Sequence, residues 1–298
     1  MIRLAVRVAR EHAERALAEL LELAPAGVEE SALEDGRVEY AVYGAPGELP
    51  ALPALRALAG GTTVEISTTE VADDWAERWR EFHRPVLVEP PPGVDLPALR
   101  VRPPWEPVAA AAAARGAGVI ELVIDPGQAF GTGAHASTRL CLELLLLLRS
   151  EMPPPAAVLD LGTGSGVLAI AAAKLGYGPL LGLDNESESV SAAAENAAVN
   201  GVELATRRFD LRREPLPWVG DGEPAPPGRP VIVLANLLAP LLRDLGAAIA
   251  TAPVGLVAGG LLVEQLDEAA AGFATALDMR ERTRRVADGW GALWLVRA

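Results

Sequence analysis

Cysteine is nearly absent from this 298-residue sequence, which has a single one at position 141, and only three histidines are present. One cysteine cannot form an intramolecular disulfide, and a thiolate metal cluster needs several, so we expect neither a disulfide nor a metal site. A chain without disulfides is typical of a reducing compartment. The composition therefore predicts a cytoplasmic protein.

Long apolar segments are also missing. The apolar runs at 109–114 and 144–148 fall far short of the roughly 20 residues that cross a bilayer. Residues 1–8 alternate apolar and charged side chains and do not form the continuous apolar segment of a signal peptide. We expect no membrane span and no membrane partner.

Basic residues are outnumbered, since 26 Lys and Arg stand against 40 Asp and Glu and give a formal net charge of −14. Such a charge repels a phosphate backbone, whose binding depends on Lys and Arg displacing counterions. Nucleic acid is therefore not expected as a partner, whereas a basic protein would be attracted. Half of the residues are hydrophobic, which favours a chain that is folded throughout.

A chain of this length can form two domains of unequal size. In the first 67 residues, strand-like segments and segments of helical spacing follow each other in the order βαββαβ. This order is typical of a ferredoxin-like fold, so we predict a small α+β ferredoxin-like domain at 1–67. The predicted elements are 2–8, 10–24, 28–33, 38–42, 49–59 and 64–67.

Residues 68–100 are predicted to be a linker. Within it, Trp75, Trp79 and Phe82 recur at helical spacing on one face of a short helix. We expect this aromatic stripe to pack between domains and not to bind a ligand. Prolines at 90–92 and 103–104 indicate edges and turns where the second domain begins.

Residues 101–298 are predicted to be an α/β domain. From residue 157 onward, strand and helix patterns alternate, which predicts a parallel sheet. The last two strands, near 278–286 and 290–296, have no helix between them and predict an antiparallel hairpin. A mostly parallel sheet with such a hairpin is the usual plan of class I methyltransferases, whereas a dinucleotide-binding Rossmann sheet ends in parallel strands. The Pro-rich and Gly-rich stretch 212–230 is expected to be a surface loop.

A glycine-rich turn with Gly162, Gly164 and Gly166 joins the predicted strand 158–161 to the next helix. Glycines let backbone N–H groups approach a ligand closely, as in nucleotide, flavin and S-adenosylmethionine sites. The carboxylate of Asp160 would oppose a pyrophosphate by about 4 kcal/mol at about 4 Å, but it would attract an amino or sulfonium group. The turn therefore predicts an S-adenosylmethionine site.

Two further carboxylates follow the next two strands. Asp184 ends the second strand, 22 residues beyond Gly162, where a carboxylate can accept both ribose hydroxyls of an adenosine. A helix N-cap is the alternative role for Asp184. Asp210 lies just past the third strand and is a candidate partner of the adenine amino group, with a solvated loop residue as the alternative.

Asn236 follows the fourth strand, at the carboxyl edge where α/β folds bind their ligands. Its side-chain carbonyl can accept a hydrogen bond from an amine, although it can also serve only to form a turn. Methyl transfer to nitrogen needs a neutral amine, while a lysine has a reference pKa of about 10.4. We expect desolvation and orienting acceptors, instead of a strong base, to favour the neutral amine.

Upstream of the glycine turn, residues 125–142 read DPGQAFGTGAHASTRLCL. This stretch, followed at this distance by the glycine turn, resembles the PrmA family, the methyltransferases of ribosomal large-subunit protein eleven. The resemblance extends over nearly the whole chain beyond the first domain. It includes 75–85, 104–106, Asp184, the pair Asn196 and Asn200, and the turn at 236–238.

The resemblance implies that S-adenosylmethionine is the cofactor and that Phe130 and Thr138 line its pocket beside Gly162, Asp184 and Asn236. It also implies a protein partner, the ribosomal protein, which the N-terminal domain captures. The methylated groups implied are lysine side chains and the N-terminal α-amine.

His135 lies in the same stretch and has a side chain suited to act as a base, with packing or hydrogen bonding as the alternative role. Of three other functions, a cofactor-binding assembly factor without turnover is disfavoured by the intact motifs, and two stay open at this point. One is a related protein-lysine methyltransferase with another protein target, and a more distant one is a nicotinamide-dependent oxidoreductase.

Overall fold

The computed structural model describes residues 2–9, 29–33, 36–44, 65–70, 83–108, 118–126, 131 and 133–298. The chain divides into two compact units, residues 1–82 and residues 83–298.

The first unit contains a four-stranded antiparallel sheet in the order β2-β3-β1-β4. Alternation of apolar and polar residues explains the central strands, because Leu4, Val6 and Val8 are buried on β1 and Tyr40 and Val42 are buried on β3. The four predicted strands are confirmed, whereas the predicted helices at 10–24 and 49–59 lie outside the described residues. The strands are β1 (Ile2–Ala9), β2 (Glu29–Ala32), β3 (Arg37–Gly44) and β4 (Glu65–Glu70).

The second unit is built on a seven-stranded sheet in the order β10-β9-β8-β11-β12-β14-β13. The first five strands of this order are parallel, and β14 and β13 are antiparallel to their neighbours. The predicted parallel sheet with a C-terminal hairpin is therefore confirmed. The strands are β8 (Ala157–Leu161), β9 (Leu180–Asp184), β10 (Ala205–Arg208), β11 (Val231–Asn236), β12 (Gly255–Leu262), β13 (Met279–Ala287) and β14 (Trp290–Arg297).

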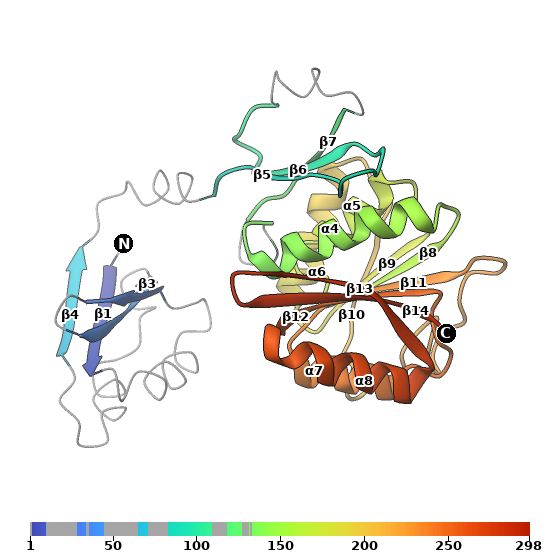
Figure 1. Ribbon diagram of the computed structural model, residues 1–298. Coiled ribbons are helices and arrows are strands. Elements are labelled where there is room, and N and C mark those ends of the chain that lie inside the picture. Colours follow the sequence, from blue (N-terminus) through green and yellow to red (C-terminus); the bar gives the residue numbers. More distant parts are fainter. Residues whose placement is uncertain are drawn as a thin grey trace. The chain divides into compact units, whose positions relative to one another are not determined.

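Helices cover both faces of this sheet, with α4 and α5 on one side and α7 and α8 on the other (Figure 1). Strand β8 shows why both faces need cover, because Val158 joins the apolar core of the first side and Leu159 joins that of the second. Helix α6 contributes Ala197 to the first core. The helices are α4 (Ala136–Glu151), α5 (Val167–Lys174), α6 (Ser187–Val199), α7 (Ala239–Ala248), the 3-10 turn η3 (Val263–Gln265) and α8 (Leu266–Leu277).

A second, three-stranded sheet lies against α4 and α5 and was not predicted as a sheet. It consists of β5 (Val86–Val88), β6 (Ala98–Arg102) and β7 (Val119–Val123), in the order β5-β6-β7. Two of its strands, β5 and most of β6, fall within the predicted linker 68–100. Its apolar side chains Val88, Leu99 and Leu122 are buried in the same core as α4 and α5.

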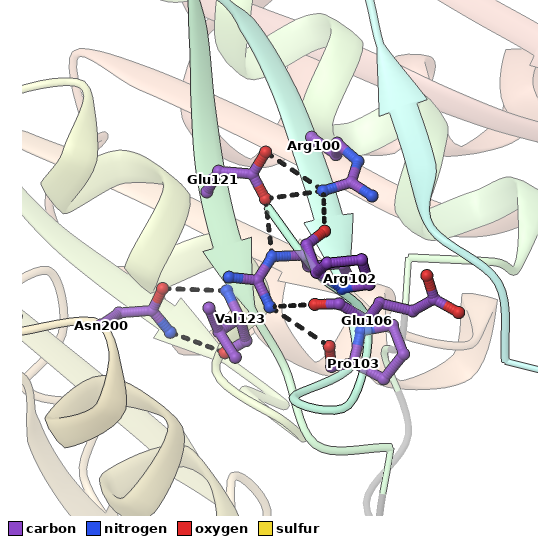
Figure 2. Close-up of polar contacts among 8 residues, drawn as sticks. Arg100, Arg102, Pro103, Glu106, Glu121, Val123 and Asn200 are labelled. Carbon is purple, nitrogen blue, oxygen red and sulfur yellow. Dashed lines mark hydrogen bonds and ion pairs between the residues drawn. The ribbon is translucent and has the colours of Figure 1, made fainter. Parts of the chain in front are cut away.

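Ion pairs hold together the polar face of this small sheet. Glu121 on β7 accepts hydrogen bonds from Arg100 at 3.0 Å and from Arg102 at 2.7 Å, both on β6 (Figure 2). Arg102 also donates to the carbonyl of Glu106 at 2.7 Å, so the predicted proline turn is attached to the sheet. The turn itself is confirmed by the bond from the Glu106 N–H to the Pro103 carbonyl. Strand β6 alternates buried apolar residues with arginine, as a half-buried strand does, but it is only five residues long and crosses the boundary predicted at residue 100.

The stretch 212–230 contains no helix or strand, as predicted. It is nevertheless anchored in the protein, because Leu216 and Val219 are buried in the core beneath α7 and α8. None of the helices in the described ranges is long and apolar enough to cross a membrane.

Candidate functional site

The glycine turn follows β8 and places three residues in the left-handed region of backbone space. Gly162, Gly164 and Gly166 have φ values of 65°, 53° and 81°. A side chain at Gly162 would collide with the side chain of Leu237, and a Cβ at Gly166 would lie 3.2 Å from the backbone of Ala193. Glycine is therefore required here by conformation and by space. Leu237, which follows β11, therefore lies directly against the turn that follows β8.

Asp184 ends β9, as predicted, and its carboxylate reaches back to the glycine turn. One oxygen accepts the N–H of Gly164 at 2.9 Å, and the other accepts the N–H of Glu186 at 3.1 Å, at the start of α6. The carboxylate therefore fixes the turn and helps to begin the helix at the same time. A ribose at this position would share the oxygens with these two backbone donors.

Asp160 is buried inside the turn. Its Oδ2 accepts a hydrogen bond from the Thr163 hydroxyl at 2.8 Å and from the Ala169 N–H at 3.3 Å. Its Oδ1 is buried and has no hydrogen-bond partner within the described part of the chain. Burial raises the pKa of the Asp160 carboxyl to about 7, and the nearby Asp184 adds to that effect. A cationic group near Oδ1 would restore the charged form.

Asn236 ends β11 and lies beside Thr138 in the first turn of α4. The Asn236 amide donates to the Thr138 hydroxyl at 3.2 Å. Its Oδ1 is the second acceptor of the site that is buried without a partner among the described residues. The structure thus brings Thr138 and Asn236 together, as predicted, and it directs the amide oxygen toward Gly259 on β12.

His135 caps the N-terminus of α4. Its Nδ1 accepts the N–H of Ser137 at 3.3 Å and lies 2.8 Å from the Ser137 hydroxyl. The ring meets Trp290 edge-on, with 4.8 Å between the centroids. Partial burial lowers the pKa of His135. These contacts support the hydrogen-bonding role that was the alternative to catalysis.

Asp210 lies just beyond β10 and is partly exposed. Its carboxylate accepts the N–H of Arg212 at 2.9 Å and lies 3.4 Å from the guanidinium of Arg213.

Phe130, the other predicted pocket residue, lies outside the described residues. The described ranges contain no group of three or more His, Cys, Asp or Glu side chains able to hold a metal ion.

Sequence reasoning missed Ser165, which is fully buried in the glycine turn. Its hydroxyl donates to the carbonyl of Gly131 at 2.7 Å and links the turn to the stretch around His135. A serine between two glycines gave no sign of this contact.

The buried amides of Asn196 and Asn200 were noticed only through the family resemblance, although their spacing of four residues places them on one face of α6.

Comparison with known proteins decides the family. The family model described as ribosomal protein L11 methyltransferase (PrmA) matches residues 51–297. The chain belongs to the PrmA family. Among PrmA relatives, the ribosomal protein L11 methyltransferase of Geotalea uraniireducens is 40% identical over 235 residues, which cover 74% of this chain and 67% of the relative. That of Syntrophotalea carbinolica is 36% identical over 257 residues, which cover 83% and 73%.

A solved PrmA structure supports the same conclusion for the fold. The crystal structure of ribosomal protein L11 methylase from Lactobacillus delbrueckii subsp. bulgaricus matches with a TM-score of 0.54 and 30% identity, over 67% of this chain and 94% of the other. The second unit therefore has the Rossmann-like class I S-adenosylmethionine-dependent methyltransferase fold with a seven-stranded mixed sheet. Membership of PrmA favours S-adenosylmethionine over the nicotinamide alternative. The matches span about two thirds of the length of the curated relatives.

Replacing Asp184 with alanine should weaken the binding of S-adenosylmethionine about tenfold or more, because Gly164 would lose its partner and a ribose bound at this edge would lose a charged acceptor. Isothermal titration calorimetry with S-adenosylhomocysteine measures this loss. Asp221→Ala, at an exposed aspartate in the 212–230 stretch, is the control. An affinity of Asp184→Ala equal to that of the control would contradict the role of Asp184.

The raised pKa of Asp160 predicts a pH-dependent stability. In the folded chain the Asp160 carboxyl holds its proton up to about pH 7, whereas in the unfolded chain it loses the proton near pH 4. Its contribution to the free energy of unfolding is therefore fully present below about pH 4 and is lost as the pH rises through about 7. Relative to Asp160→Asn, the free energy of unfolding of the native chain should fall by up to about 1.4 kcal/mol per pH unit in this window. Urea unfolding of both chains at pH 5 and pH 8 tests this, and an equal difference at both pH values would refute it.

Proposed function

We propose that this chain methylates amines of ribosomal protein L11 with S-adenosylmethionine as the methyl donor, at lysine side chains, at the N-terminal α-amine, or at both. The observation that carries the proposal is the buried, unpartnered Oδ1 of Asn236 at the carboxyl edge of the sheet; the next residue, Leu237, packs against Gly162 of the glycine turn. An acceptor that lacks a donor at this edge fits a site that receives an amine.

The residues of the site fit the cofactor. The N–H groups of the glycine turn and the carboxylate of Asp184 would hold the adenosine, with Asp210 near the adenine and Phe130 in the pocket wall. The unpartnered Oδ1 of Asp160 suits the cationic amino group, and Thr138 suits the amino-acid end of the same molecule. When bound, S-adenosylmethionine supplies an electrophilic methyl group on a sulfonium. The roles of these residues are part of the proposal.

The protein contributes positioning and desolvation to the reaction. Asn236 would accept a hydrogen bond from the substrate amine and direct its lone pair, while the buried apolar side chains of the strands behind the edge exclude water. Exclusion of water favours the neutral amine, which is the nucleophile. His135 is engaged in the cap of α4, so we assign it a structural role and propose no base at this position.

The N-terminal unit would recognise the protein substrate. The strand order β2-β3-β1-β4, all antiparallel, supports a ferredoxin-like fold for the predicted domain 1–67. The unit that carries the site begins at residue 83, so the linker predicted at 68–100 and the catalytic domain predicted at 101–298 are proposed with their boundary moved to residue 83. The formal charge of −14 supports a protein partner over a nucleic acid. A ribosomal substrate and the single cysteine together support a cytoplasmic location.

Asn236→Ala should lower kcat about a hundredfold and leave the affinity for S-adenosylhomocysteine nearly unchanged, because the lost acceptor acts on the amine. Asn236→Asp, which keeps an oxygen at the same place, should retain more activity than alanine. Steady-state kinetics and calorimetry separate the two effects. Full turnover by Asn236→Ala would mean that this residue only shapes the turn.

The proposed function is tested with unmodified, purified ribosomal protein L11 and labelled S-adenosylmethionine, with mass spectrometry locating the product. We expect label on lysine or α-amine nitrogen, and none after the addition of excess S-adenosylhomocysteine. A chain that binds the cofactor and leaves L11 unmodified would refute this substrate and direct the search to other protein targets. A chain that binds no cofactor would refute the proposal as a whole.

A further inference from the structure

The outer edge of β7 is hydrogen-bonded by a side chain in place of a strand. In the order β5-β6-β7, only one edge of β7 pairs with another strand. On its other edge, the Val123 N–H donates to Asn200 Oδ1 at 2.9 Å, and Asn200 Nδ2 donates to the Val123 carbonyl at 2.7 Å (Figure 2). The asparagine amide thus offers one acceptor and one donor, as a neighbouring strand would.

Asn196, one helical turn earlier on α6, extends this link to the glycine turn. Its Oδ1 accepts the N–H of Asp125 at 2.9 Å, and its Nδ2 donates to the Ser165 carbonyl at 2.9 Å. Asn200 also donates to the backbone carbonyl of Asn196 at 2.8 Å, so the two amides form one connected network. Both asparagines are buried, and their side-chain amides bond to the backbone groups of Val123, Asp125, Ser165 and Asn196.

The glycine turn completes the connection from its own side. The Ser165 hydroxyl donates to the carbonyl of Gly131 at 2.7 Å, so the stretch after β7 is attached at Val123, Asp125 and Gly131. These three residues are hydrogen-bonded to Asn200, Asn196 and Ser165, respectively. The last three belong to the turn that follows Asp160 and to the helix that follows Asp184. Val123, Asp125 and Gly131, which precede Thr138 in the chain, are thereby bonded to the turn after β8 and to the helix after β9.

We propose that Asn196 and Asn200 are positioning residues for the methyl donor, which hold Val123 and Asp125 beside the glycine turn. The inference rests on the proposed function, because it assigns these amides to the cofactor half of that site. They act through backbone groups and need no contact with the donor. Loss of either amide should therefore weaken cofactor binding more than it slows the chemical step.

The test uses the full chain with Asn200→Asp, Asn196→Asp and Ser165→Ala. Each aspartate keeps an acceptor for the N–H of Val123 or Asp125 and loses the donor, and Ser165→Ala breaks the link to Gly131 while both asparagines remain. The control is Glu195→Gln, an exposed and nearly isosteric change on the same helix. Calorimetry with S-adenosylhomocysteine, kcat at saturating S-adenosylmethionine, and hydrogen exchange of the Val123 and Asp125 amides are measured for each.

We expect the Kd of each of the three variants to rise about tenfold, with kcat within about twofold of wild type and faster exchange at Val123 and Asp125. Glu195→Gln should match wild type in all three readouts. Unchanged Kd values despite faster exchange at Val123 and Asp125 would overturn the inference. A joint loss of affinity, kcat and hydrogen-exchange protection across the whole sheet would also overturn it, because such a loss indicates a general structural defect. A wild-type chain that binds no S-adenosylhomocysteine would overturn the proposed function and this inference with it.

Discussion

Parallel pairing of β8 with β9 and β11 is the constraint on which the site depends. It turns the carboxyl ends of three strands to one edge and brings Asp160, Asp184 and Asn236 near each other from positions far apart in the sequence. The buried side chains of both faces maintain this pairing, since each strand contributes to two cores. Chemistry at the edge is thus supported by packing on both sides of the sheet.

Much of the second unit could be predicted from the sequence because its signals are local. Strands such as β8 are short apolar runs followed by turn residues, and the glycines of the turn adopt the positive φ values that only glycine takes readily. The hairpin of β13 and β14 followed from two strand patterns with no helix between them. The carboxyl-edge positions of Asp184 and Asn236 followed from the same alternation.

Features that depend on contacts distant in sequence could not be read in the same way. Strands β5, β6 and β7 are only three to five residues long, and the ion pairs of Glu121 with Arg100 and Arg102 join residues 21 and 19 positions apart in the sequence. The role of His135 could not be predicted for a different reason. A histidine that caps a helix and a histidine that acts as a base look alike in a sequence, and only the hydrogen bond from the Ser137 N–H shows the capping role. The buried amides on α6 are recognisable only once β7 lies beside them.

The anchored stretch 212–230 has a consequence for how this protein can vary in length. With Leu216 and Val219 in the core, the first half of the stretch belongs to the folding unit even though it has no regular structure. Residues 226–230 are mostly exposed. Insertions, tags or additional recognition elements are therefore accommodated toward β11, whereas a deletion that removed both buried side chains would open a cavity under α7.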